Sequence, residues 1–240
     1  MIYSILIPYF NRSYQLYKTL RSFEYHYKDR NDYEIVIAED IKTIQDIKQH
    51  QRLIGVIAVF TNLNIVHIKT NYENCWNPAS LFCDASKVAK GKYFIITNPE
   101  VVHKSNILNA LDKEFEKDEN IYIICSCENI ENYKSFYEYK HISWYQHSKH
   151  RNRMLHFCTA ISKENYFKIG GFDKRYRYGA GVDDVDFIEK VKKSNLKIIV
   201  RDDLETLHLD HGLAQDIIPD YDKLWKINKD LFKEIHEYKN

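Results

Sequence analysis

Four groups of polar residues in this chain each follow an apolar run, and their side chains could bind a phosphate, a divalent cation or a sugar hydroxyl. Carboxylates and imidazoles can ligate a metal, and a carboxylate can also act as a general base. In chain order the groups are Pro8, Tyr9, Asn11 and Arg12; Glu39 and Asp40; Asn98, Pro99 and Glu100; and a late set with Gly170, Gly171, Phe172, Asp173, Asp183, Asp184, His208 and His211. Because open parallel sheets bind ligands at the carboxyl ends of their strands, we expect the groups to meet at one sheet edge.

The late group carries the sharpest chemical pattern. Asp183 and Asp184 are adjacent at the start of a helical pattern, where one carboxylate can cap the helix and the other can act as a base. Asp186 is expected to begin the solvated face of that helix. His208 and His211 would lie too far apart in a strand to chelate one ion together, so we expect either one to bind a metal beside a carboxylate.

Each group also has an ordinary structural explanation. A carboxylate at a strand end, such as Asp40, more often caps the following helix than binds a ligand, and Asn11 is a common turn former. The segment from Asn98 to Glu100 can be a simple turn, and a single histidine is usually a packed or surface residue. The functional interpretation therefore depends on the groups meeting in space.

The apolar periodicity predicts the elements that must position these groups. Short apolar runs predict strands at 2–7, 33–38, 65–68, 93–97, 121–126, 157–161 and 197–200, and we also expect a buried strand at 53–60. Helical spacing predicts helices near 16–27, 77–91, 105–115, 184–193 and 221–235, whereas 128–150 has no assignable pattern. Strands that alternate with helices indicate an α/β fold.

Composition limits the class of protein. The 240 residues, 44% of them hydrophobic, are enough for one domain, and 35 basic against 34 acidic residues leave a net charge of +1 without a basic block, which argues against nucleic-acid binding. We expect no transmembrane segment and no signal peptide, because no apolar run is long enough and the N-terminus lacks a basic region. The five cysteines lack zinc-type spacing, which favours reduced thiols and a cytoplasmic location. Association into a homo-oligomer is left open.

With these groups in view, nearly the whole chain resembles a family 2 type glycosyltransferase, and its C-terminal part is similar to the galactosyltransferase and polypeptide N-acetylgalactosaminyltransferase group. The resemblance rests on the P-Y-F-N-R segment at 8–12, the G-G-F-D segment at 170–173 and the G-V-D-D segment at 181–184. It implies a GT-A fold, a Rossmann-like mixed sheet flanked by helices, with the C-terminal helix packed outside. In a single domain, residues 1–127 would form the nucleotide-binding half, 128–212 the acceptor and catalytic half, and 213–240 the C-terminal helix.

The resemblance also implies a hexosyl- or N-acetylhexosaminyltransferase (EC 2.4) that transfers a sugar, with inversion, from a UDP-sugar to a hydroxyl of a glycan or other acceptor. Asp184 would be the catalytic base, and Asp183 would position sugar hydroxyls. Mn²⁺ or Mg²⁺ would be held by Glu100 and His208, with His211 as the second choice. The implied nucleotide contacts are Pro8, Tyr9, Asn11, Arg12, Asp40 and Asn98, and the implied donor and acceptor sugar contacts are Gly170, Gly171, Phe172 and Asp173.

Two positions depart from the family pattern. The amide of Asn98 stands where the family's metal motif has its first carboxylate, and Ala180 replaces a tryptophan that would stack on a sugar. Both departures favour a non-catalytic nucleotide- or glycan-binding module as an alternative. A nucleotidyltransferase that forms sugar nucleotides is the other alternative, although no glycine-rich phosphate loop follows the first strand.

Overall fold

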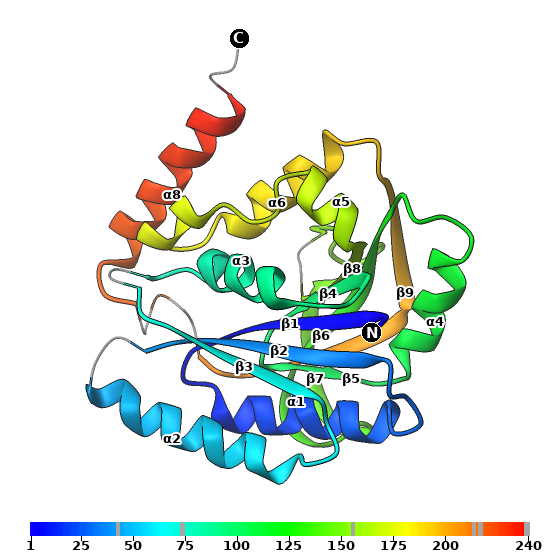
Figure 1. Cartoon of the computed structure of the whole chain (residues 1–240). Coiled ribbons are helices and arrows are strands. Elements are labelled where there is room, and N and C mark those ends of the chain that lie inside the picture. The colour runs from blue at the N-terminus through cyan, green and yellow to red at the C-terminus, as the bar shows by residue number, and fades with distance from the viewer. Residues whose placement is uncertain (42–43, 73–74, 155–156, 213–214, 216–217, 238–240) are drawn as a thin grey trace.

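The computed structural model describes residues 1–41, 44–72, 75–154, 157–212, 215 and 218–237. In these residues one sheet of nine strands runs in the order β3-β2-β1-β4-β8-β6-β9-β5, and β7 pairs with β6 (Figure 1). The strands are β1 (Tyr3–Tyr9), β2 (Tyr33–Asp40), β3 (Ile65–Thr70), β4 (Tyr93–Thr97), β5 (Val101–His103), β6 (Ile121–Ser135), β7 (Glu138–Gln146), β8 (Cys158–Ser162) and β9 (Lys197–Leu209). The predicted mixed α/β architecture is confirmed.

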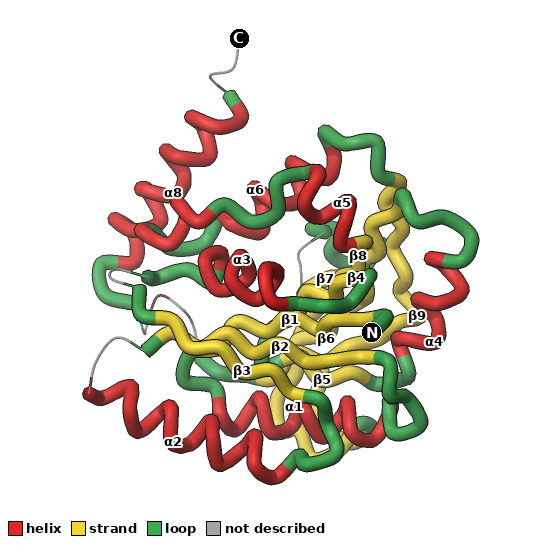
Figure 2. The backbone as a smooth tube through the Cα atoms, viewed as in Figure 1, coloured by secondary structure: helices red, strands yellow, loops and turns green. Residues whose placement is uncertain are grey.

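Helices cover both faces of this sheet (Figure 2). One face packs against α1 (Ser13–His26), α2 (Ile44–Val59) and α4 (Ile107–Phe115). The other packs against α3 (Ala79–Val88), α5 (Lys163–Lys168), the 3-10 helix η1 (Lys174–Tyr178), α6 (Asp183–Lys192) and α8 (Tyr221–His236). Strand residues alternate between the two cores: Ile5 and Ile7 face α1, and Leu6 faces α3. All seven residues of β1 are therefore buried, which fits a mainly apolar sequence whose polar member is Ser4.

The strand directions decide where polar groups can meet. β1 pairs in parallel with both β2 and β4, so the carboxyl ends of these three strands lie at one edge of the sheet. β9 reaches the same edge by a different route, because it pairs antiparallel with β5 and places His208 opposite Val101. The amide of Leu209 donates to the carbonyl of Glu100 at 2.9 Å. The end of β9 therefore lies beside the segment that follows β4.

Two sequence expectations are corrected by the fold. Residues 53–60 do not form a strand: most of them lie in α2, where Leu53, Val56 and Ile57 face the core at helical spacing. The unassigned segment 128–150 is mainly the long antiparallel hairpin of β6 and β7. Its polar composition fits its position, because much of β7 is exposed.

The predicted C-terminal helix is present as α8 and packs at the periphery, as expected (Figure 1). Within the predicted segment 213–240, residues 213–214, 216–217 and 238–240 lie outside the described part. None of the described helices combines the length and apolar character needed to cross a membrane.

An ion cluster fixes α8 to α6, and it corrects the expectation for Asp186. That side chain is fully buried rather than solvated. Its carboxylate lies 2.8 Å from Nε2 of His236 on α8 and 2.6 Å from Nζ of Lys190 on α6. The Lys190 ammonium also donates to the carbonyl of Gly171 at 3.0 Å. The helical pattern of α6 could not reveal this burial, because the covering helix comes from much later in the chain.

Candidate functional site

A cavity of about 530 Å³ opens at the carboxyl ends of β1, β2 and β4. Its wall contains three of the four predicted groups, with contributions from the loop before α3. The lining residues are Pro8, Tyr9, Phe10, Asn11, Arg12, Asp40, Gln49, Cys75, Trp76, Asn77, Pro78, Leu81, Asn98, Pro99, Glu100 and Ile218. A larger hollow of about 720 Å³ lies near the opposite ends of the strands, next to Arg30 and Lys92, and contains none of the predicted groups.

The segment after β1 forms one wall of the cavity. Asn11 adopts a left-handed backbone conformation with φ of 47°, which turns the chain into α1. Asp40, at the end of β2, is buried and accepts a hydrogen bond from the amide of Tyr72 at 3.0 Å. Tyr9 is different, because its ring packs in the core with Ile5 and Ile7. The side chains at 11, 12 and 40 are therefore better placed than the Tyr9 ring to meet a ligand.

Glu100, His208 and His211 form a cluster, which we call the floor cluster, and Glu100 is the member that lines the cavity. Oε1 of Glu100 lies 3.8 Å from Nε2 of His208 and 3.5 Å from Nε2 of His211. The two Nε2 atoms are 3.2 Å apart. One ligand atom from each residue lies within 4.8 Å of the others, so the three could hold one metal ion.

The convergence of His208 and His211 corrects the expectation that they could not share an ion. That expectation assumed that both residues lie in a strand. β9 ends at Leu209, and the chain then turns so that the His211 ring folds back, with its centroid 4.9 Å from that of His208. The end of the strand, rather than the residue spacing, determines the geometry.

A hydrogen-bonded chain sets the protonation of the two rings. Arg12 can only donate, so its Nη2, 3.1 Å from Nδ1 of His211, leaves the proton of that ring on Nε2. His211 then donates to Nε2 of His208, and Nδ1 of His208 donates to Oδ1 of Asn129 at 3.3 Å. Nε2 of His208 is therefore an acceptor and can ligate a metal directly. His211 can ligate through Nε2 only if Arg12 releases its Nδ1.

The electrostatics of the floor cluster favour a cation. Burial raises the pKa of Glu100 to about 7, although the charge of Arg12 opposes the shift. Burial, with the nearby charges of His211 and Arg12, lowers the pKa of His208 to about 3, so this ring is neutral at neutral pH. Oε2 of Glu100 is buried and has no hydrogen-bond partner among the described residues. A divalent cation would neutralise the carboxylate and satisfy this atom, so the donor set fits Mn²⁺ or Mg²⁺.

A second hollow of about 330 Å³ adjoins the cavity and contains the carboxylate pair. It shares Asn98 and Glu100 with the first cavity and adds Asp183, Asp184 and Tyr221. The structure thus places Glu100 of the floor cluster and the carboxylate pair along one continuous depression. Its direction runs from the strand ends of the N-terminal half toward the start of α6.

The two carboxylates differ in their surroundings. Asp183 is buried and accepts a hydrogen bond from Nδ2 of Asn77 at 2.7 Å. Burial, together with the charge of Asp184, raises the pKa of Asp183 to about 7. Asp184 is half-buried, and its Oδ1 accepts only a short-range bond from the amide of Val185 at 2.8 Å. Asp183 therefore ties the loop to the segment before α3, and Asp184 is the more accessible of the two.

Backbone contacts hold the loop in front of this pair. Val182 has φ of 72°, a left-handed conformation that is unusual for a β-branched residue. The carbonyl of Gly181 accepts from Nδ2 of Asn77 at 3.0 Å and from Nδ2 of Asn228 on α8 at 2.8 Å. Gly179 must lack a side chain, because a Cβ there would lie 2.4 Å from Oδ1 of Asn228. The segment before α3 and helix α8 thus fix the backbone that leads into Asp183.

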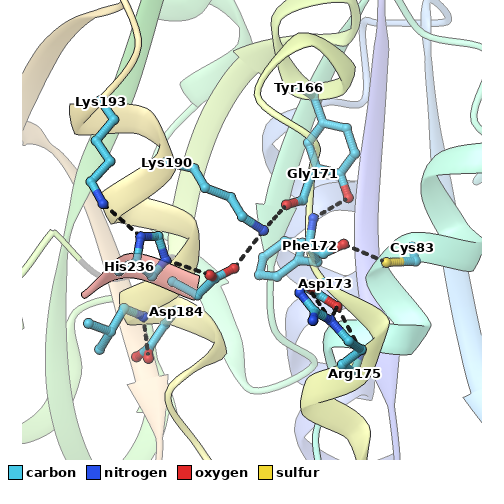
Figure 3. A network of polar contacts seen from close by, with 12 residues as sticks. Cys83, Tyr166, Gly171, Phe172, Asp173, Arg175, Asp184, Lys190, Lys193 and His236 are labelled. Carbon is cyan, nitrogen blue, oxygen red and sulfur yellow. Dashed lines mark hydrogen bonds and ion pairs between the residues drawn. The ribbon is translucent and has the colours of Figure 1, made fainter. Parts of the chain in front are cut away.

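The segment from Gly170 to Asp173 lines neither hollow. Phe172 is buried between Phe82 and Phe187, with ring centroids 4.5 Å from each. Asp173 caps η1 and pairs with Arg175 at 2.7 Å (Figure 3). The expected sugar contacts are therefore not visible in this geometry. The segment instead packs the turn that leads to the loop before Asp183.

Sequence reasoning missed several cavity residues. Trp76 lines both hollows, and its amide is bound to the carbonyl of Arg177 at 2.9 Å. Asn77 stands at the start of the helix predicted near 77–91; its Oδ1 accepts from the amide of Ala79, and its Nδ2 also reaches the Asp183 loop. Gln49 comes from α2, inside a segment expected to precede a strand. The signal in the sequence that could have indicated these cavity residues was Trp76, close to Pro78 at the start of a helix.

Comparisons with known proteins agree with this geometry. Residues 141–211 match the family model described as the N-terminal domain of galactosyltransferase, and no curated protein matches the chain. The matched range contains Asp183, Asp184, His208 and His211. It confirms the galactosyltransferase-like character expected for the C-terminal part.

Three solved structures share the fold at low sequence identity. TarS of S. aureus in complex with UDP-GlcNAc has a TM-score of 0.70 at 14% identity, covering 98% of this chain and 66% of its own. GalNAc-T7 with UDP, GalNAc and Mn²⁺ has a TM-score of 0.68 at 14% identity, covering 98% and 51%. The mannosyltransferase PcManGT from Pyrobaculum calidifontis, with GDP-Man and Mn²⁺, has 0.63 at 14%, covering 95% and 60%. The chain thus has the GT-A fold of nucleotide-sugar glycosyltransferases and spans no more than 66% of these three structures.

Proposed function

We propose that this GT-A fold protein is an inverting, metal-dependent glycosyltransferase that uses a nucleoside-diphosphate sugar, with UDP as the expected nucleotide. The acceptor would be a hydroxyl of a glycan or another molecule. The observation that carries the proposal is the continuous depression that joins Asp40, Glu100 and Asp184, with His208 and His211 in contact with Glu100. The similar structures bound to UDP-GlcNAc or to UDP and Mn²⁺ support the choice of donor and metal.

The nucleotide would bind at the ends of β1 and β2. Asp40 is buried and lines the cavity, so its carboxylate can accept hydrogen bonds from a base or ribose. Arg12 lies between this region and the floor cluster, where its guanidinium can pair with phosphate oxygens. Pro8, Asn11 and Asn98 complete the expected nucleotide contacts as parts of the same wall.

Glu100 and His208 would hold Mn²⁺ or Mg²⁺ beside the diphosphate. When bound, the metal supplies positive charge that neutralises the departing diphosphate. The protein contributes a buried carboxylate and an imidazole whose Nε2 is kept as an acceptor by the bond to Asn129. Movement of Arg12 onto a phosphate would free Nδ1 of His211 and allow that residue to join as a further ligand.

Asp184 would act as the catalytic base. Glycosyl transfer with inversion needs a group that accepts the proton of the attacking hydroxyl on the face opposite the diphosphate. Asp184 faces the second hollow and is more accessible than Asp183, whose carboxylate is bound to Asn77. Asp183 would position a hydroxyl and hold the loop in place.

The proposal is tested by incubating the purified protein with a panel of sugar nucleotides, with Mn²⁺ and with EDTA, and measuring release of the nucleoside diphosphate. We expect metal-dependent hydrolysis of at least one UDP-sugar. Asp184→Asn should lower turnover by roughly 10² or more while UDP affinity is retained, because asparagine can still cap the helix but cannot accept the proton.

Asp183→Asn serves as the matched variant, because it changes the neighbouring carboxylate in the same way and should affect sugar recognition more than the chemical step. UDP binding without turnover of any donor would indicate a non-catalytic nucleotide-binding module. Full turnover in excess EDTA would contradict the metal role and point to Arg12 or Arg175 as the group that neutralises the diphosphate.

A further inference from the structure

A second cluster of one glutamate and two histidines lies between α2 and the sheet. Glu39 comes from β2, His67 from β3 and His50 from α2, and we call these three residues the helix α2 cluster. Oε2 of Glu39 lies 2.7 Å from Nδ1 of His50 and 2.9 Å from Nε2 of His67. One ligand atom from each residue lies within 4.8 Å of the others.

The fold brings these residues together by two separate periodicities. β2 and β3 pair in parallel with Ile37 opposite His67, so Glu39 lies two residues further along on the same face. On α2, His50 precedes the buried Leu53 by three residues and therefore faces the sheet. The cluster shares no residue with the floor cluster.

The partners of the buried Glu39 carboxylate in this cluster are imidazoles. The Glu39 side chain is only 3% exposed, so a carboxylate charge is buried here. Within the described part of the chain, no lysine or arginine lies within ion-pair distance of Glu39. Buried charges in proteins are usually paired or bound to a metal.

We infer that Glu39, His50 and His67 form a second metal site, which binds Zn²⁺ or a similar transition-metal ion. Two imidazoles and one carboxylate are a common ligand set for zinc, with a fourth position left for water. The His50 and His67 side chains are 18% and 13% exposed, so an ion and a water can enter from solvent. The site lacks the diphosphate oxygens expected at the floor cluster, and its nitrogen ligands favour zinc over magnesium.

The two nitrogen–oxygen distances in the cluster are slightly shorter than those between the ligand atoms of a zinc site. Tetrahedral zinc with bonds of about 2.0 to 2.1 Å keeps its ligand atoms roughly 3.3 Å apart. The observed 2.7 and 2.9 Å are shorter, so small side-chain rotations would open the cluster around an ion. Bound metal would fix α2 to β2 and β3, next to Gln49 and Asp40 in the cavity wall. The inference does not depend on the proposed transferase function.

The test isolates the helix α2 cluster by removing the imidazoles of the floor cluster. A His208→Ala, His211→Ala double variant is stripped with EDTA and titrated with Zn²⁺, and bound metal is measured by equilibrium dialysis. We expect one tightly bound equivalent. Co²⁺ in its place should give the visible absorption bands of a four-coordinate ion.

Adding His50→Gln to this background should weaken zinc binding by about 100-fold or more, because a glutamine amide can still donate to Glu39 but is a poor metal ligand. His141→Ala is the matched control, because His141 also contacts a glutamate, with Nδ1 3.0 Å from Oε2 of Glu128, but has no second imidazole partner in that contact. It should retain the full equivalent.

The inference is overturned if the folded double variant binds no stoichiometric Zn²⁺, or if His50→Gln leaves the zinc affinity unchanged. If His50→Gln does not fold, the same comparison is made with His67→Gln. Should that variant also fail to fold, zinc-induced stabilisation of the double variant against heat, its absence with Mg²⁺ and the cobalt spectrum decide the question. Absence of both the stabilisation and the cobalt bands would reject the site.

Discussion

The floor cluster and the helix α2 cluster each contain one glutamate and two histidines, but the pKa of the glutamate is shifted in opposite directions in the two clusters. In the floor cluster, burial raises the pKa of Glu100 to about 7 and leaves Oε2 without a hydrogen-bond partner in the described residues. In the helix α2 cluster, Glu39 is bound by both imidazoles and its pKa is lowered. Glu100 lines a cavity large enough for a ligand, whereas the helix α2 cluster lies between a helix and the sheet, with its two imidazoles partly exposed.

The difference shows that ligand composition alone does not set the chemistry of a site. A buried carboxylate with an unsatisfied oxygen is stabilised only when a cation arrives, so the floor cluster suits a metal that comes with its substrate. A carboxylate already bound by two imidazoles is stable in either state, so the helix α2 cluster suits a metal that stays with the fold. Each prediction below changes one side of this comparison.

The largest difference is expected in activity. Glu100→Gln should lower metal-dependent transfer by roughly 10² to 10³, because it removes a charged ligand next to the departing diphosphate. Glu39→Gln should lower zinc binding and thermal stability, with a smaller effect on transfer. Steady-state kinetics with saturating Mn²⁺ measure both variants, and Glu128→Gln provides a control that should retain the parent kcat. Equal losses of activity at Glu100 and Glu39 would break the comparison.

The second difference is the pH dependence of stability without metal. Glu100 keeps its proton in the folded state up to a pKa of about 7 and loses it near 4.5 when unfolded, so its contribution is present below pH 4.5 and is lost as pH rises through 7. The loss relative to Glu100→Gln should be about 3 kcal/mol in the free energy of unfolding.

Glu39 should show the opposite slope. Its pKa is lowered on folding, so its contribution is present above the ordinary value of 4.5 and is lost as the pH falls through the folded-state pKa. Urea unfolding in EDTA at a series of pH values, compared between the parent and each glutamine variant, gives both slopes. Slopes of the same sign would mean that the two carboxylates are not in different settings.

Removing a contact of a third buried carboxylate should have an intermediate effect on stability, which can be compared with the effects at Glu100 and Glu39. Asp186 is bound by His236 and Lys190, so it already has a cationic partner. His236→Ala should destabilise the fold by about 2 kcal/mol, because it removes a hydrogen bond to a buried charged group. Zinc should neither rescue this variant nor bind at the site, as measured by urea unfolding with and without Zn²⁺.

The smallest effect is expected on the protein surface. His141 contacts Glu128 but is 44% exposed, so solvent weakens the pair. His141→Ala should change the free energy of unfolding by less than about 0.5 kcal/mol. A loss as large as that of His236→Ala would show that exposure does not separate these histidine–carboxylate contacts.

Sequence reasoning predicted the elements whose periodicity is local. β1 and β4 are mainly apolar because both sheet faces are covered, and their predicted limits were close to the observed ones. The strand predicted at 53–60 was wrong. A short run of valine, isoleucine and phenylalanine resembles a buried strand, and only the packing of α2 on the sheet shows that it is a helix. The sequence therefore predicted helix or strand correctly where the length of the apolar run and its flanking residues indicated the same element.

Site geometry was recoverable only in part. The polar groups of β1, β2 and β4 could be placed at one edge, because parallel strands fix their carboxyl ends. The convergence of His208 and His211 could not, because it depends on where β9 ends. The helix α2 cluster also escaped, since Glu39, His50 and His67 meet through sheet register and helix packing rather than through any local spacing.

The bond from Asn228 to the loop before Asp183 has a consequence for how the protein is made on the ribosome. Gly181 and Asn228 are separated by 47 positions, and the later residue belongs to the last described helix. Because chains are synthesised from the N-terminus at about 5 to 20 residues per second, the sheet can begin to form seconds before α8 is available. The loop is then held from one side only, through Asn77. The carboxylate pair reaches its final position only after translation has passed Asn228 and α8 has docked.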